Sequence, residues 1–115
     1  MTTVERQTVP ESFIARLKAD GFDDYRIEPI AENYDSDWHM AGWYGRFLVL
    51  RGTVELEIGG DKFSYSKGGS YDVAANARHR EVFGAEGGSL VIARRSAGTP
   101  LPALRASSAA AVSLR

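Results

Sequence analysis

Two histidines and one glutamate are the residues best suited to chemistry at a single centre. The chain contains only two histidines, His39 and His79, and Glu81 follows the second by two positions. Side chains two positions apart on a strand share a face, so His79 and Glu81 would be neighbours. Together with His39, and with Asp37 as a further candidate, they form a donor set that suits Fe(II), Mn(II), Ni(II) or Zn(II). Such a set leaves positions open for a substrate.

The same residues also have other interpretations. His39 could simply pack beside Trp38 at the start of a strand. Glu81 could instead form a salt bridge with one of the nearby arginines, which are Arg46, Arg78 and Arg80. The run Asp35-Ser36-Asp37 is typical of a solvated turn. Without a metal, His79 or Glu81 could still move a proton as a general acid or base.

Short alternating segments separated by glycine turns would have to position these side chains. Val54, Leu56 and Ile58 alternate with Glu55 and Glu57, and Gly59-Gly60 supplies a tight turn. Further strands are expected at Phe63 to Tyr65, Tyr71 to Val73, His79 to Phe83 and Ser89 to Ala93. Short strands at spacings of about ten residues favour an all-β sandwich or barrel.

The segment before these strands predicts a short helix. Pro10 suits a first helical turn, Glu11 favours the positive end of the helix dipole, and Gly21 can terminate the helix. A helix over residues 10–20 and an edge strand from Tyr25 to Ile30 are therefore expected.

Composition limits the classes of function. A chain of 115 residues suits one domain, and the absence of cysteine excludes disulfides and thiolate chemistry. A net charge of -1 without a basic run does not favour a nucleic-acid partner. No apolar stretch approaches the ~20 residues that span a bilayer. Residues 1–6 lack the pattern of a signal peptide, so a cytoplasmic protein without a membrane partner is expected.

Two segments resemble the two halves of the cupin pattern. Cupins are small β-barrels that bring a histidine from each half together at the mouth of one pocket. With the turn glycine of the first half placed at Gly52, the first histidine of that half falls on His39. Ala41 and Gly45 then occupy the positions of the usual second histidine and glutamate. The resemblance therefore implies a metal site with fewer ligands than usual.

The second half of the pattern is more complete. His79 matches the last ligand position, while Ala74 and Asn76 replace a proline and a glycine. Asparagine tolerates the left-handed conformation that a glycine would adopt. The closest resemblance is to small single-domain cupins whose second half contains His-x-Glu, Gly-x-Glu-Gly and a basic pair. Here these are His79-Arg80-Glu81, Gly84-Ala85-Glu86-Gly87 and Arg94-Arg95.

This resemblance implies an all-β, cupin-type double-stranded β-helix (jelly-roll) barrel with a short N-terminal helix. Residues 1–35 would hold the helix and a leading strand, 36–95 the barrel, and 96–115 a tail, all within one domain. The inner face is expected to carry Val54, Leu56, Ile58, Tyr71, Val73 and His79.

The resemblance also implies where a site would lie. His39, His79 and Glu81 would bind the metal, with the histidine ring nitrogens within ~5 Å of each other for a shared ion. Catalysis would involve His79, Glu81 and Tyr44, and the substrate pocket would have walls of Trp43, Tyr44, Phe47 and Tyr71. Trp43 and Tyr44 could alternatively belong to the core.

Three functions follow from these patterns. The first is a barrel with a reduced metal site that acts on or binds a small organic molecule, for example as an oxygenase, isomerase or lyase. The second is a metal-free isomerase or cyclase that uses acid–base chemistry. The third is a ligand-binding or sensing barrel without catalysis.

A homodimer is the expected assembly. The run Phe47 to Leu50 is too apolar to face water and should be covered on both faces. Residues 96–115 are rich in alanine and serine, which is typical of a flexible tail, although such a tail could dock on its own barrel or on a neighbour. The pair Arg94-Arg95 is typical of surface or subunit-contact charge. Cupins of this size often pair through their barrels, so the resemblance also implies a homodimer.

Overall fold

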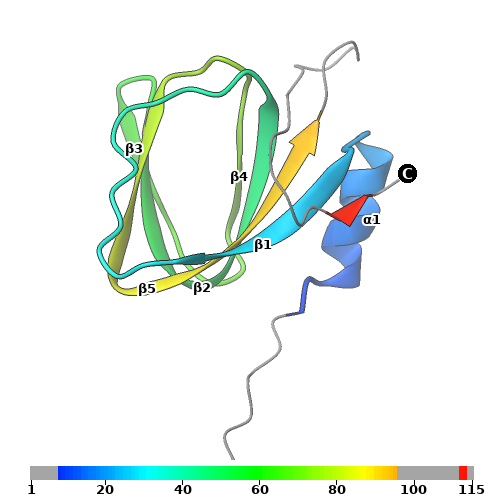
Figure 1. Ribbon diagram of the computed structural model, residues 1–115, viewed down its shortest axis with the longest axis horizontal. Helices are drawn as coiled ribbons and strands as arrows, with labels where there is room; N and C mark the ends of the chain where they lie inside the picture. The colour runs from blue at the N-terminus through cyan, green and yellow to red at the C-terminus, as the bar shows by residue number, and fades with distance from the viewer. Residues whose placement is uncertain (1–7, 96–111, 114–115) are drawn as a thin grey trace, which may run out of the picture.

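The computed structural model describes residues 8–95 and 112–113. One helix is followed by six strands, and the strands curl into a barrel with the helix outside it (Figure 1). The elements are α1 (Glu11–Ala19), β1 (Asp24–Ile30), β2 (Tyr44–Ile58), β3 (Asp61–Tyr65), β4 (Ser70–Val73), β5 (His79–Arg95) and β6 (Val112–Ser113). The all-β prediction with a short N-terminal helix is confirmed.

Helix α1 begins and ends where the sequence signals predicted. Pro10 is the N-cap residue, and the acidic Glu11 occupies the first turn. At the other end Gly21 adopts a φ of 80°, and the Phe22 amide donates to the Leu17 carbonyl at 3.0 Å. Leu17 is fully buried, so this short helix is held mainly by its contact with the barrel.

Two long strands, β2 and β5, form the frame of the barrel. They pair antiparallel along most of their length, and β5 also pairs with β1, while β2 also pairs with β3 and β4. Their register shifts between Val49 and Val54, where the chain bends. Gly52 lies there with a φ of 89°, and a Cβ atom would stand 2.1 Å from the Gly87 carbonyl oxygen. Only glycine permits this close crossing of the two strands.

The barrel encloses a mainly apolar interior. The predicted inward face is confirmed, because Val54, Leu56, Tyr71 and Val73 are buried in one cluster, with Ile58 packed against it. His79 is buried as well, with 3% of its surface exposed.

The outer face of the barrel is covered by α1. Leu48 and Val91 are buried there together with Val9, and Phe13 and Ile14 of the helix pack against them. The apolar run of β2 is therefore covered on both faces, as predicted. The chain's own helix provides the outer cover for Leu48, so this side chain does not require a second subunit.

The basic pair at the end of β5 does not lie on the surface, so that expectation is wrong. Arg94 and Arg95 are 4% and 5% exposed. The Arg94 guanidinium donates to the Asp24 carboxylate of β1 at 2.7 Å, and the Arg95 Nε donates to the Asp20 carbonyl at the end of α1 at 2.8 Å. These hydrogen bonds join β1 and α1 to the barrel.

The last strand lies within the predicted tail. Val112–Ser113 pairs antiparallel with Asp24 and Tyr25, so this part of the chain docks on its own barrel. The remaining tail residues, 96–111 and 114–115, lie outside the described residues. None of the helices in the described part of the chain is long and apolar enough to cross a membrane.

Candidate functional site

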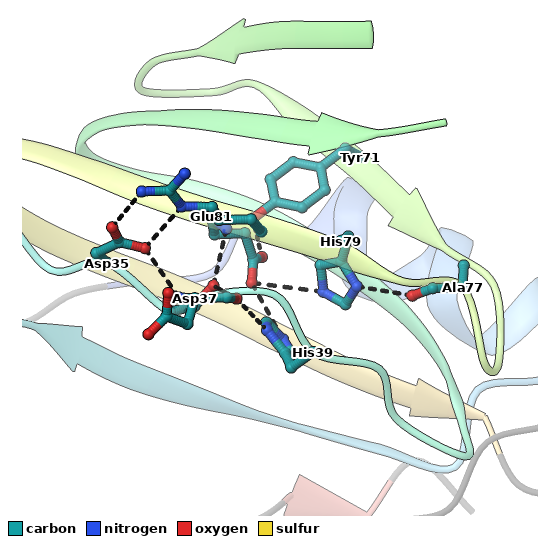
Figure 2. Close-up of polar contacts among 9 residues, drawn as sticks. Asp35, Asp37, His39, Tyr71, Ala77, His79 and Glu81 are labelled. Atoms are coloured by element: carbon teal, nitrogen blue, oxygen red, sulfur yellow. Dashed lines mark hydrogen bonds and ion pairs between the residues drawn. The ribbon is translucent and has the colours of Figure 1, made fainter. Parts of the chain in front are cut away.

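The two histidines meet although 39 and 79 are far apart in the sequence. His39 lies in the segment between β1 and β2, and its backbone forms an isolated antiparallel bridge with His79 at the start of β5. Both backbone hydrogen bonds of this bridge measure 2.9 Å. Figure 2 shows the two rings and Glu81 converging from these two segments. The ring centroids lie 4.2 Å apart.

One donor atom from each of the three residues faces a common point. Glu81 Oε1 lies 3.8 Å from His39 Nε2 and 3.6 Å from His79 Nε2, and the three ligand atoms lie within 4.8 Å of one another. The prediction that the ring nitrogens approach within ~5 Å is confirmed. The two distances from Glu81 Oε1 to the histidine nitrogens are short enough for donors that share one ion with bonds of ~2.1 Å.

The second nitrogen of each ring holds that ring in place. His39 Nδ1 donates to the Asp37 carbonyl, and His79 Nδ1 donates to the Ala77 carbonyl, both at 2.9 Å. A carbonyl oxygen can only accept, so each Nδ1 carries a proton. In the neutral imidazole each Nε2 therefore keeps a lone pair directed at the cluster, as metal-binding histidines require. The residues present fit a divalent metal.

Glu81 is a buried carboxylate with one oxygen committed to the protein. The Tyr71 hydroxyl donates to Glu81 Oε2 at 2.7 Å, which leaves Oε1 facing the histidines. Glu81 is 8% exposed, and no arginine in the described part of the chain pairs with it. The salt-bridge interpretation of Glu81 is therefore wrong.

Burial and charge oppose each other at this cluster. Burial alone would lower the pKa of His79, but the Glu81 carboxylate and the Ala77 carbonyl outweigh it and raise that pKa. Burial alone would raise the pKa of Glu81, but hydrogen bonds from His79 and Tyr71 and the histidine charges lower it. The pair therefore favours a protonated His79 beside an ionised Glu81 when no metal is bound.

The segment before His39 is an ordered turn rather than a second ligand pair. The Asp35 carboxylate accepts from Arg80 at 2.9 Å and from the Asp37 amide at 2.8 Å. The hydrogen bond from Arg80 lowers the pKa of Asp35 to about 2. Asp37 has a φ of 60°, and its carbonyl receives the His39 ring proton. Asp37 thus orients a candidate ligand through its backbone.

A cavity of about 470 Å³ adjoins the cluster. Its lining includes the three donors together with Ala41, Gly45, Trp43 and Phe47. The two positions where the resemblance expects missing ligands therefore face the cavity. A Cβ atom on Gly45 would lie 2.8 Å from the rings of both Trp43 and Phe47, so these aromatic rings occupy the space beside Gly45.

The structure does not bring Tyr44 to this cavity. Alternation along β2 turns it away from the face of Trp43 and Gly45. Its ring lies 5.8 Å from that of Phe22, and its hydroxyl donates to Asp72. Burial, helped by Asp72, raises the pKa of Tyr44 to about 12. The expectation that Tyr44 acts in the site is corrected accordingly.

Tyr71 has a different position from that expected. It does not line the cavity, but its ring stacks on Phe47 at 4.9 Å and its hydroxyl binds Glu81. Tyr71 therefore contacts two residues that line the cavity, Phe47 and Glu81, without lining it itself.

The turn before His79 keeps the shape that the pattern requires. Asn76 adopts a φ of 64°, as expected for a residue in the place of a glycine. The backbone amide of Asn76 donates to the Ala41 carbonyl at 2.7 Å. This bond ties the turn to the segment that carries His39.

A larger hollow of about 700 Å³ lies between α1 and the outer face of β2. Its lining includes Phe13, Leu48 and Lys67 but none of the three clustered donors. We therefore assign the candidate site to the smaller cavity inside the barrel.

Sequence reasoning missed several lining residues. Arg26, Glu28 and Ile30, which share one face of β1, line the cavity, and Phe83, Leu90 and Ile92 line it from β5. The period of two in β1 was the available signal. It could not be used because the sequence does not reveal that β1 pairs with β5.

Comparison with known proteins identifies the fold. No family model and no curated protein matches the chain. Among solved structures, the cupin domain of Cnp3 from Schizosaccharomyces pombe aligns with a TM-score of 0.57 and 14% identity, over 64% of this chain and 61% of that one. The aligned region is thus less than two-thirds of that domain.

Two further structures have the same fold. A cupin 2 conserved barrel domain protein from Salinispora arenicola aligns with a TM-score of 0.53 and 18% identity, over 64% of this chain and 60% of that one. The polyketide cyclase RemF from Streptomyces resistomycificus aligns with a TM-score of 0.51 and 18% identity, over 78% of this chain and 67% of that one. The barrel with histidines from both halves at one cavity therefore has the fold of a small cupin domain.

Proposed function

We propose that this cupin-fold chain binds a divalent metal ion through His39, His79 and Glu81 and holds a small organic molecule in the adjoining cavity. The observation that carries the proposal is the convergence of three ligand atoms within 4.8 Å, with both rings oriented by backbone carbonyls. A bound ion would supply Lewis acidity toward an oxygen atom of that molecule.

The residues of the chain have separate tasks in this proposal. Two Nε2 atoms and Glu81 Oε1 hold the ion, and Tyr71 holds the other carboxylate oxygen. Fe, Mn, Ni and Zn all accept such a set, and three protein ligands leave room for a substrate atom. Oxygenase, isomerase and lyase reactions are all compatible with this arrangement. A cytoplasmic location is part of the proposal, because a chain without cysteine suits a reducing compartment.

Metal content measured without an affinity tag tests the proposal. Purified protein should take up close to one equivalent of Zn or another of the four metals, and His79→Ala and Glu81→Gln should lose it. Glu86→Gln provides a matched control, because Glu86 is an exposed carboxylate outside the cavity. Failure of the native protein to take up any of the four metals would overturn the metal centre.

The imidazole signals give a second, independent measurement. The chain has only two histidines, so nuclear magnetic resonance of the rings reports on this site alone. Zinc should shift the Nε2 resonances of both rings and leave both Nδ1 atoms protonated. A shift confined to one ring would contradict a shared ion.

A metal-free acid–base function is the second candidate. The buried pair of His79 and Glu81, 3.6 Å apart, favours it because one partner carries a proton and the other accepts one. A polyketide cyclase is among the proteins of similar fold, which supports chemistry on a small organic molecule in such a barrel. Activity that persists after complete removal of metal would favour this candidate over the first.

A further inference from the structure

The lining of the site cavity is poor in groups that form hydrogen bonds. Charged side chains occur at two places only among the described lining residues. One is the cluster of His39, His79 and Glu81, and the other is Arg26 with Glu28, which pair with each other at 2.9 Å. Elsewhere the lining side chains with polar atoms are Tyr34 and Trp43, and the rest are apolar.

This lining disfavours a sugar. Each hydroxyl buried without a partner costs about 1–3 kcal/mol, and a sugar carries several. Apart from the Arg26–Glu28 pair, Tyr34 and Trp43, the wall beyond the donor cluster consists of apolar side chains, which cannot form these bonds. The cavity is therefore suited to a ligand whose polar atoms are gathered at one end.

The aromatic walls favour a flat ligand. The Trp43 and Phe47 rings lie 6.4 Å apart, and Phe47 stacks on Tyr71 at an interplanar angle of 16°. Gly45 makes this arrangement possible, because a Cβ atom there would lie 2.8 Å from both Trp43 and Phe47. Ring faces held in this way offer offset or edge-to-face contacts to another aromatic ring.

Size and polarity then agree on one class of molecule. A volume of about 470 Å³ lies within the range of cavities that enclose small organic ligands. Ala41 and Gly45 line the same cavity as His39, His79 and Glu81 and offer no side-chain donor atoms. A ligand that fits both regions has a hydroxyl or carbonyl oxygen at one end of a fused aromatic body.

We infer that the site takes a flat aromatic molecule of two or three rings with a phenolic, enolic or carbonyl oxygen directed at His39, His79 and Glu81. This inference rests on the proposed function for the role of that oxygen. The aromatic body packs against Trp43, Phe47 and Phe83. The ligand class thus follows from the walls, and its orientation follows from the donor cluster.

Calorimetry with 2-naphthol and with galacturonate tests the inference. Zinc-loaded protein should bind 2-naphthol in the micromolar range with a negative heat-capacity change, and galacturonate should not bind at millimolar concentration. Trp43→Ala should weaken 2-naphthol binding tenfold or more. Trp38→Ala is the matched control, because Trp38 is exposed, carries Arg78 over its ring and does not line the cavity.

A second variant covers the case in which Trp43→Ala fails to fold. Ala41→Phe fills the cavity from the loop without removing a core ring, so it should abolish 2-naphthol binding in a folded protein. Tighter binding of galacturonate, or equal 2-naphthol affinity in native protein and Ala41→Phe, would overturn the inference. Metal content is measured separately. If no metal binds, the proposed metal centre fails, and the same titrations on metal-free protein still decide the ligand class.

Discussion

At the scale of single residues, backbone carbonyls prepare the site. Each imidazole donates its Nδ1 proton to the carbonyl two positions earlier, which turns Nε2 toward Glu81. Tyr71 does the same for the carboxylate by binding Oε2. These contacts fix three side chains before any ion arrives, so little conformational entropy remains to be lost on binding.

Restoring one missing ligand should strengthen the metal site. Ala41 lines the cavity close to the donors, so Ala41→His adds a nitrogen donor where the cupin pattern has one. We expect zinc affinity to rise by about tenfold or more, equivalent to ~1.4 kcal/mol. Competition against a chromogenic chelator measures the change. Ala85→His, at an exposed position of β5, should leave the affinity unaltered, and equal effects of the two substitutions would contradict this assignment.

Metal affinity should depend on pH through His79. Its pKa is raised, and the ion requires the neutral ring, so a proton must leave when metal binds. Zinc affinity should therefore fall by about tenfold per pH unit once the pH drops below that raised pKa. Zinc titrations between pH 5.5 and 8 test this prediction, because the pKa of an ordinary histidine, ~6.5, lies within that range. A pH-independent affinity over this range would exclude His79 as a ligand.

The stability of the metal-free protein should also depend on pH, through His79 and Glu81. A raised folded-state pKa means that His79 contributes stability at low pH, which is lost as the pH rises through that value. The lowered pKa of Glu81 means that its contribution is lost as the pH falls through its folded-state value. Urea unfolding should thus show the greatest stability at pH values between the folded-state pKa values of Glu81 and His79. Glu81→Gln should flatten this dependence of stability on pH.

At the scale of elements, β1 and α1 are attached to the barrel by buried arginines. Asp24 of β1 and Arg94 of β5 pair directly across the strands, and Arg95 contacts the end of α1. One terminal nitrogen of Arg94, Nη1, is buried without a hydrogen-bond partner. The attachment therefore includes a charge that depends on Asp24 for compensation.

Removing Asp24 should consequently destabilise the fold. Asp24→Ala leaves a buried, uncompensated guanidinium, and we expect a loss of about 3 kcal/mol in the free energy of unfolding. Replacing both Asp24 and Arg94 with leucine and methionine should recover most of this loss. Glu28→Ala on the same strand breaks the more exposed pair with Arg26 and should cost less than ~1 kcal/mol. Similar losses for Asp24→Ala and Glu28→Ala would contradict the argument.

At the scale of the whole molecule, assembly remains a prediction. The apolar run of β2 gave one reason to expect a homodimer, but α1 covers its outward-facing Leu48. Exposed apolar side chains elsewhere, including Ile27 and Phe63, give a different reason. We expect light scattering at tens of micromolar to give the mass of a dimer, and a monomer mass would contradict it. Ile27→Lys and Phe63→Lys would then show which surface pairs.

The sequence by itself determined the local features of this protein. Period-two alternation predicted the inward face of β2, and the Pro10 and Gly21 signals predicted the limits of α1. Likewise, the spacing of His79 and Glu81 placed both side chains on one face. These properties depend on neighbours within a few positions, so periodicity and turn chemistry were sufficient.

Only the tertiary structure decided the properties that depend on strand pairing. The approach of the His39 and His79 rings was expected only from the cupin resemblance, and the backbone bridge between these residues was not predicted, because nothing local to either residue specifies it. Tyr44 and Trp43 look equivalent in the sequence, yet the pairing of β2 turns only Trp43 into the cavity. Arg94 looked like a surface charge because its partner, Asp24, lies 70 positions away. Long-range register decides which side chains meet, and local pattern cannot encode that register.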